Sequence, residues 1–213
     1  MNNRNSRPSR IDQLVDVTGV NIVTTEEKQA KLDEIAAAII GRELNLEIAK
    51  SCLNPVPGEG NPDAEIMFIG EAPGKQEDQK GEPFVGASGK FLEEMLQSIN
   101  LRRDDVFITN IVKFRPPDNR DPNEQEIKAC LPYLLAQIKI IQPKLIIFLG
   151  RHSMNVFFPE LKISEAHGKV FRRQGKVFLP LYHPAAALYN GGMRTVLLED
   201  FSQIPAILAT VDK

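Results

Sequence analysis

The chain has 213 residues, of which 42% are hydrophobic, and this is enough for one α/β domain with a sizeable buried core. A formal net charge of −2 argues against a protein that binds nucleic acid over a wide basic surface, but it is compatible with a local basic patch. The sequence contains no apolar stretch near the roughly 20 residues that span a bilayer, and the start MNNRNSRPSR lacks the apolar middle of a signal peptide. We therefore expect a cytoplasmic protein with no membrane partner.

The predicted elements begin after a polar segment without periodicity, residues 1–23, which we expect to be flexible and to precede a single domain over residues 24–213. A first helix is predicted from Thr24 or Thr25 to about residue 51. Further helices are predicted over residues 88–99, 121–141 (opened by Asp121 and Pro122), 150–158 and 193–210. Between the helices lie four short apolar runs: Ala64–Ile69, Val106–Thr109, Leu145–Leu149 and Val177–Leu181.

Nearly all-apolar strands that alternate with helices predict a parallel sheet covered on both faces. The expected fold class is α/β, a three-layer α/β/α sandwich with a four-stranded parallel sheet. In such sheets ligands bind beyond the carboxyl ends of the strands. Glu71 follows the first predicted strand, Asn110 ends the second and His183 follows the fourth, so we predict a site where the three meet.

The chemistry of this edge is narrowed by the motifs that the sequence lacks. Gly89-Lys90 is followed by Phe91 rather than Ser or Thr, which excludes a phosphate-binding loop in the glycine-rich stretch, and no Ser or Cys nucleophile elbow is present. The three histidines are too scattered to predict a metal site.

What remains near the edge is the amide of Asn110, the imidazole of His183, the carboxylate of Glu71 and the aromatic ring of Phe84. Each alone is compatible with a structural role. Together they suit a base turned out of a nucleic acid, because an amide reads a donor and an acceptor on a flat heterocycle while an aromatic ring stacks on it.

Five blocks of sequence carry a resemblance over roughly residues 56–201: GEGNPDAEIMFIGEAPG, EDQKGEPFVGASGKFLEEML, ITNIVKFRPPDNR, HGKVF and YHPAAAL. In this order and spacing they resemble the uracil-DNA glycosylases of family 4. The resemblance implies hydrolysis of the N-glycosidic bond of deoxyuridine in single- or double-stranded DNA, which releases uracil and leaves an abasic site. The rival hypotheses are a catalytically weak relative that only binds DNA lesions and a small-nucleotide-binding protein, the latter disfavoured by the missing phosphate loop.

The resemblance also implies roles for individual residues. Asn110 pairs with the uracil O4 and N3 edge, and His183 stabilises the departing uracil anion at O2. The third catalytic candidate is Glu71, because it is the only carboxylate in the loop Gly70–Gly74. It positions the water or, alternatively, holds the loop through hydrogen bonds to backbone amides. The implied substrate-binding residues are Gly70, Glu71, Ala72, Pro73, Gly74, Phe84, Asn110 and His183, with Phe84 stacking on the base. The implied DNA-binding residues are Gly86, Ser88, Gly89, Lys113, Arg115, Asn119, Arg120, Pro184, Ala185 and Leu188, with Leu188 or a neighbour as the wedge in the vacated stack.

The chain departs from the family at its cofactor. Family 4 enzymes typically carry a [4Fe–4S] cluster on four cysteines. This sequence contains only Cys52 and Cys130, and Ala49 and Phe114 stand where the other two are expected. We therefore expect no cluster, no other cofactor, and a monomer that remains active.

Overall fold

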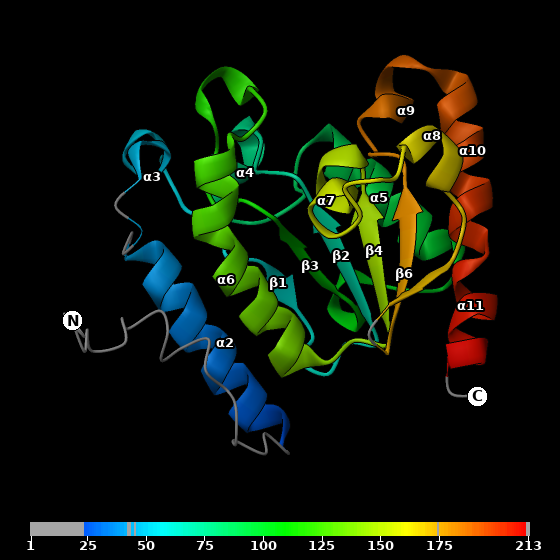
Figure 1. The fold of residues 1–213 in the computed structure, drawn as a ribbon, viewed down its shortest axis with the longest axis horizontal. Coiled ribbons are helices and arrows are strands. Elements are labelled where there is room, and N and C mark those ends of the chain that lie inside the picture. The colour runs from blue at the N-terminus through cyan, green and yellow to red at the C-terminus, as the bar shows by residue number, and fades with distance from the viewer. Residues whose placement is uncertain (1–23, 42–43, 45, 174, 212–213) are drawn as a thin grey trace, which may run out of the picture.

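A computed structural model of the chain describes residues 24–41, 44, 46–173 and 175–211, so the expected flexible segment 1–23 lies outside the described residues. Six strands form one sheet in the order β1-β3-β2-β4-β6-β5 (Figure 1). The four central strands run parallel: β3 (Phe107–Asn110), β2 (Ile66–Gly70), β4 (Leu145–Leu149) and β6 (Lys176–Leu181). The expected four-stranded parallel sheet is therefore corrected to a mixed six-stranded sheet, because β1 (Glu59–Gly60) and β5 (Phe171–Arg173) pair antiparallel at its two edges.

The central strands are apolar along their whole length because both faces of the sheet are covered. In β2, Met67 and Ile69 belong to one hydrophobic cluster, whereas Ile66 and Phe68 belong to another. This alternation divides the core into two layers, one on each face.

Helices cover both faces and complete the three layers (Figure 1). The first cluster takes side chains from α2 (Thr25–Ile40), α3 (Glu47–Ser51), α6 (Glu124–Ile141) and α7 (Arg151–Phe157). The second takes them from α5 (Ala87–Ser98), α10 (Gly191–Ser202) and α11 (Ile204–Val211). The connections contain α4 (Lys75–Lys80), η1 (Arg103–Asp105), η2 (Pro117–Asn119), α8 (Ile163–Ala166) and α9 (Ala186–Tyr189). None of the helices in the described part of the chain is long and apolar enough to cross a bilayer.

Three helix predictions need correction. The first predicted helix is two helices, because α2 ends at a cap on Gly41 and α3 begins at Glu47. The predicted closing helix is likewise divided into α10 and α11 at Gln203. Helix α6 begins after Asn123 rather than at Asp121, because the Asn123 side chain accepts from the backbone N–H of Glu126 and the Glu126 side chain accepts in return. Asp121 is thereby left in the loop before α6.

The register of the parallel strands brings their carboxyl ends together on one side of the sheet, which we call its carboxyl edge. Gly70 pairs with Asn110 across β2 and β3, and Leu149 pairs with Leu181 across β4 and β6. The loop after β2, Asn110 and His183 therefore share this edge, as the strand pattern predicts.

Candidate active site

A cavity of about 340 Å³ opens at the carboxyl edge of the sheet. The predicted site residues that line it are Glu71, Ala72, Pro73, Gly74, Phe84, Ser88, Asn110, Asn119, Arg120, His183 and Ala185. Three more residues line it that the sequence did not single out as site residues: Glu77, Pro116 and Asp121. Residues from four separate connections thus surround one hollow.

Gly70 lies behind the cavity wall rather than in it. A Cβ atom at Gly70 would lie 2.3 Å from Asn110 Oδ1 and 2.7 Å from Phe84 Cζ. The absence of a side chain at Gly70 is therefore what allows the amide and the ring to lie side by side.

Phe84 is fixed by its backbone. It has a φ of 52°, in the left-handed region, and its side chain is buried. Its carbonyl oxygen accepts a hydrogen bond from Arg103 Nη1 over 3.0 Å, and a Cβ at Gly89 would lie only 1.8 Å from that oxygen. The following loop is held by Glu77, whose Oε1 accepts from the backbone N–H groups of Val85 and Gly86 over 2.9 and 2.8 Å. The ring therefore has a defined position before any ligand enters.

Asn110 lines the cavity and contains a buried acceptor without a donor. The residue is 2% exposed, and its Oδ1 finds no hydrogen-bond donor among the described residues. A buried oxygen without a donor costs about 1–3 kcal/mol. A ligand with an N–H group at this point would remove that cost.

His183 is neutral at physiological pH and has a defined tautomer. Burial is the main cause that lowers the pKa of His183 to about 4; nearby His152 lowers it further, and the Glu77 carboxylate acts in the opposite direction. Its Nδ1 accepts the backbone N–H of Ala185 over 3.1 Å, so the ring proton lies on Nε2. The ring stacks with that of Phe84 at 5.7 Å between centroids. His183 thus offers the site one neutral N–H donor.

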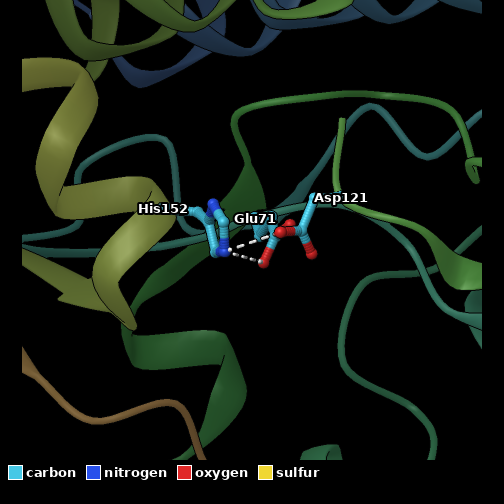
Figure 2. A group of neighbouring side chains, drawn as sticks. All are labelled: Glu71, Asp121 and His152. Atoms are coloured by element: carbon cyan, nitrogen blue, oxygen red, sulfur yellow. Dashed lines mark ion pairs between the residues drawn. The ribbon is translucent and has the colours of Figure 1, made fainter. Parts of the chain in front are cut away.

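Glu71 belongs to a polar cluster at the rim of the cavity (Figure 2). Its Oε2 lies 3.9 Å from His152 Nε2, which in turn lies 3.3 Å from Asp121 Oδ2. Burial, and then the neighbouring charge of Asp121, raise the pKa of Glu71 to about 7, while Arg151 acts in the opposite direction. Glu71 therefore changes charge within the physiological pH range.

Comparison with known protein families agrees with this geometry. Residues 57–203 match the model of the uracil DNA glycosylase superfamily. The chain belongs to this superfamily. A type-4 uracil-DNA glycosylase of Sulfurisphaera tokodaii is 53% identical over 74% of this chain and 76% of its own length. The type-4 enzymes of Saccharolobus solfataricus and Archaeoglobus fulgidus are 52% and 49% identical, over 74% and 81% of this chain and 77% and 91% of their own lengths.

The resemblance implies that Lys113 contacts DNA, and its position in the structure contradicts this. Lys113 is fully buried, and its Nζ donates to Thr109 Oγ1, the Asn110 carbonyl and Gln137 Oε1 over 2.6, 2.8 and 2.8 Å. Burial lowers the pKa of Lys113 to about 7. Because its ammonium is enclosed by three oxygens, Lys113 supports the strand end that carries Asn110 instead of facing DNA.

The other basic residues of the KFRPPDNR segment are accessible but paired. Arg115 Nε donates to Asn119 Oδ1 over 2.8 Å. Arg120 forms two hydrogen bonds with the Glu126 carboxylate, at 2.9 and 2.7 Å, and its side chain is 44% exposed. The local basic patch is therefore partly neutralised by two carboxylates of the chain itself, Asp78 at 3.9 Å from Arg115 Nη1 and Glu126 beside Arg120.

The remaining residues implied to contact DNA lie in the segments 86–89 and 184–188, and they differ in their exposure. Gly86, Ser88 and Ala185 are partly exposed near the cavity, and Leu188 is 43% exposed on α9. Gly89 and Pro184 are buried, and the expectation that they contact DNA stays a prediction. Gly89 also provides the close contact beneath Phe84, as described above.

The residues at the expected cluster positions do not fit a [4Fe–4S] group. Ala49, Cys52, Phe114 and Cys130 are all buried in the same hydrophobic cluster. A cluster of this type needs four thiolates, whereas two of the four positions, Ala49 and Phe114, carry apolar side chains that cannot ligate iron. The aromatic ring of Phe114 is fully buried in this hydrophobic cluster.

Sequence reasoning missed Glu77, Asp121, Arg151 and His152. Glu77 acts through backbone N–H groups eight and nine residues away, which no spacing rule marks. The sequence pattern assigns Asp121 to a helix cap, and His152 belongs to a set of three histidines too scattered in sequence to predict a site. The available signal is that Arg151 and His152 follow the strand Leu145–Leu149 after a single glycine, at the carboxyl ends of the strands where the site is predicted.

Proposed function

We propose that this chain is a DNA glycosylase that hydrolyses the N-glycosidic bond of deoxyuridine in DNA, releases uracil and leaves an abasic site. The observation that carries the proposal is the buried, unsatisfied Oδ1 of Asn110 in a cavity that also contains an aromatic ring and a neutral N–H donor. Uracil carries an N–H at N3, which satisfies this oxygen. Cytosine has a bare N3 there, so it leaves the oxygen unpaired at a cost of about 1–3 kcal/mol.

Phe84 and His183 provide the two remaining contacts to the base. The ring of Phe84 stacks on the extruded uracil, a contact worth about 1–3 kcal/mol. The Nε2–H of His183 donates to O2, where negative charge grows as the bond from C1′ to N1 breaks and uracil leaves with the electron pair. A preorganised donor of this kind contributes about 3–4 kcal/mol to the transition state.

Glu71 positions the water that completes the reaction. A water oxygen adds to C1′ of the cation-like sugar, and the carboxylate of Glu71 accepts the proton that the water loses. This role requires the ionised form of Glu71, so the rate falls as the pH drops through the pKa of about 7.

We further propose that DNA is held at the open side of the cavity, by the segment from Arg115 to Arg120 and by Gly86 and Ser88. The short helix α9 follows His183 and ends in two exposed apolar side chains, Leu188 at 43% and Tyr189 at 91%. These two are suited to fill the gap that an extruded base leaves in the stack. Salt-dependent affinity is expected from the arginine contacts.

No cluster is part of the proposed mechanism. Support comes from the count of two cysteines in the sequence and from the apolar residues at the other two positions. The monomeric state and the cytoplasmic location stay predictions from sequence.

The test is uracil release from a labelled oligonucleotide, scored as strand cleavage at abasic sites, with cytosine and thymine oligonucleotides as substrate controls and an absorbance scan for iron–sulfur colour. The wild-type protein is expected to release uracil alone and to be colourless. Asn110→Ala and His183→Ala are expected to lose at least 100-fold in single-turnover rate, with unchanged thermal unfolding midpoints. Tight binding of uracil-containing DNA without release would instead identify a lesion-binding relative and overturn the catalytic proposal.

A further inference from the structure

The rim cluster contains more charge than a water-positioning carboxylate alone requires. The carboxylates of Glu71 and Asp121 and the Nε2 atom of His152 all lie within 4.8 Å of one another (Figure 2). The three side chains come from three places: the loop after β2, the loop before α6 and helix α7. Two carboxylates this close repel each other when both are ionised.

Two carboxylates and an imidazole form a ligand set for a divalent cation, but here the chain supplies its own cation. Arg151 Nε donates to His152 Nε2 over 3.0 Å, and Arg151 Nη2 lies 3.8 Å from Asp121 Oδ2. The guanidinium is always charged, and it engages the imidazole lone pair that a metal ion would need. The counter-charge of this cluster is therefore Arg151.

We infer that Asp121 and Arg151 are positioning residues for Glu71, which act on its carboxylate with opposite electrostatic sign and so set the pH range over which the water is activated. This inference rests on the proposed function, because it assigns a role to residues around the proposed water-positioning group. Neither residue touches the base or the sugar in the proposed arrangement. They act through the charge of Glu71.

The signs of the two effects follow from Coulomb's law. The negative charge of Asp121 makes ionisation of Glu71 harder and raises its pKa, and the positive charge of Arg151 does the reverse. Burial of Glu71 adds the largest upward contribution. Asp121→Asn and Arg151→Gln keep side chains of similar size, so each replacement changes chiefly one charge beside Glu71.

Other charged groups near the cavity are accounted for on each neighbouring element. Arg120, in the same loop as Asp121, is neutralised by Glu126 of α6. Glu77 of α4 is held by two backbone N–H groups, and His183 after β6 is neutral in the relevant range. His152 has its pKa lowered, chiefly by burial, with Asp121 opposing and Arg151 reinforcing, so it too is neutral near pH 7.

The test is the pH profile of single-turnover uracil release from a single-stranded oligonucleotide, for wild type, Asp121→Asn and Arg151→Gln. Asp118→Asn is the matched control, because Asp118 lies in the same loop without lining the cavity, and asparagine tolerates its left-handed φ of 54°. The acid limb of Asp121→Asn is expected to move down by about one pH unit, and that of Arg151→Gln to move up. One unit below the wild-type midpoint, Asp121→Asn should therefore run several-fold faster relative to its own plateau.

A second readout does not depend on turnover. The pKa of the Glu71 carboxyl is measured by ¹³C NMR of glutamate-labelled protein, with Glu71→Gln used to assign the signal. Shifts of opposite sign in the two variants, absent in Asp118→Asn, would support the inference. Because Asp121 and Arg151 side chains are 64% and 65% exposed, both shifts should shrink at high salt.

The outcomes separate the inference from the proposed function. Wild-type release with superimposable profiles, or with both variants shifted in the same direction, overturns the electrostatic role and leaves the glycosylase proposal standing. Opposite shifts in the Glu71 titration of a protein that releases no uracil would overturn the proposed function and would leave only the electrostatic coupling supported. A merely structural role for Asp121 or Arg151 lowers the plateau rate without moving the midpoint.

Discussion

The inner wall of the cavity and its rim are built on different physical principles. The wall consists of Phe84, Asn110 and His183, which are buried or half-buried, uncharged at neutral pH and fixed by the backbone. The rim consists of Asp121 and Arg151, both mostly exposed, with Glu71 and His152 between them. Fixed, uncharged polar groups in a buried wall select a base by the positions of its hydrogen-bonding atoms. Charges at an exposed rim instead change the rate of uracil release gradually with pH. Substitutions in the two regions should therefore differ in kind.

The largest effect is expected when the wall is displaced without strain in the backbone. Gly70→Ala adds a Cβ that would lie 2.3 Å from Asn110 Oδ1 and 2.7 Å from a Phe84 ring carbon, so both side chains must move. A displacement of about 1 Å in such groups costs about 100-fold in rate. The measurement is single-turnover uracil release together with the thermal unfolding midpoint.

Gly191→Ala is the matched control for this prediction. It lies in α10, and an added Cβ there meets nothing within 4 Å. The control should release uracil at the wild-type rate. Full activity in Gly70→Ala would show that the side chains of the wall are not fixed, and would contradict the difference in rigidity between the wall and the rim.

A smaller effect is expected from the support beneath the wall. Lys113→Met leaves the oxygens of Thr109, Asn110 and Gln137 without the donor that they share. The free energy of unfolding, measured with urea, should fall by about 1–3 kcal/mol. Lys128→Met, which removes an exposed lysine paired with Glu124 on α6, should change it by less than about 0.5 kcal/mol.

The same variant separates support from DNA contact. Because Lys113 does not reach the surface, its replacement should leave the salt dependence of DNA affinity unchanged. A clear reduction of that salt dependence in Lys113→Met would return Lys113 to the DNA interface and contradict the buried position.

The smallest effect is expected on the outer surface near the rim. Arg115→Gln removes one cation from the segment proposed to hold the DNA backbone, so the slope of log affinity against log salt should decrease by about 1. Arg102→Gln is the control. Arg102 precedes β3 and therefore lies toward the amino ends of the parallel strands, whereas the cavity lies at their carboxyl ends. Equal slopes in all three proteins would exclude Arg115 from the phosphate contacts.

The centre of the fold could be predicted from the sequence, and its edges could not. The four central strands are continuous apolar runs, which is typical of strands buried on both faces. Strand β1 consists of Glu59 and Gly60, and β5 carries Arg172 and Arg173, so neither shows the apolar signal. Both are defined by their partners, β3 and β6, and not by their own composition.

The site shows the same division. Asn110 and His183 could be placed from the strand ends, because the edge of a parallel sheet collects them. Lys113 could not, because its partner Gln137 lies 24 residues further along, on α6. Asp121, in the loop before α6, meets Arg151, at the start of α7. Their relative position is set by caps and tertiary contacts, which spacing in a single sequence does not encode.

Arg103 gives the site one further property. Its guanidinium donates to the carbonyl oxygens of Pro83 and Phe84, over 2.6 and 3.0 Å, and is paired with Glu59 of the edge strand β1 at 2.6 Å. The stacking ring is thereby tied to the margin of the sheet before DNA arrives, and little conformational entropy is lost by the protein when a base enters. The main free-energy cost of binding is then the unstacking and unpairing of the base in the DNA. A uracil that is already unstacked, in a single strand or a mismatch, should consequently be engaged more readily than one in a well-paired duplex.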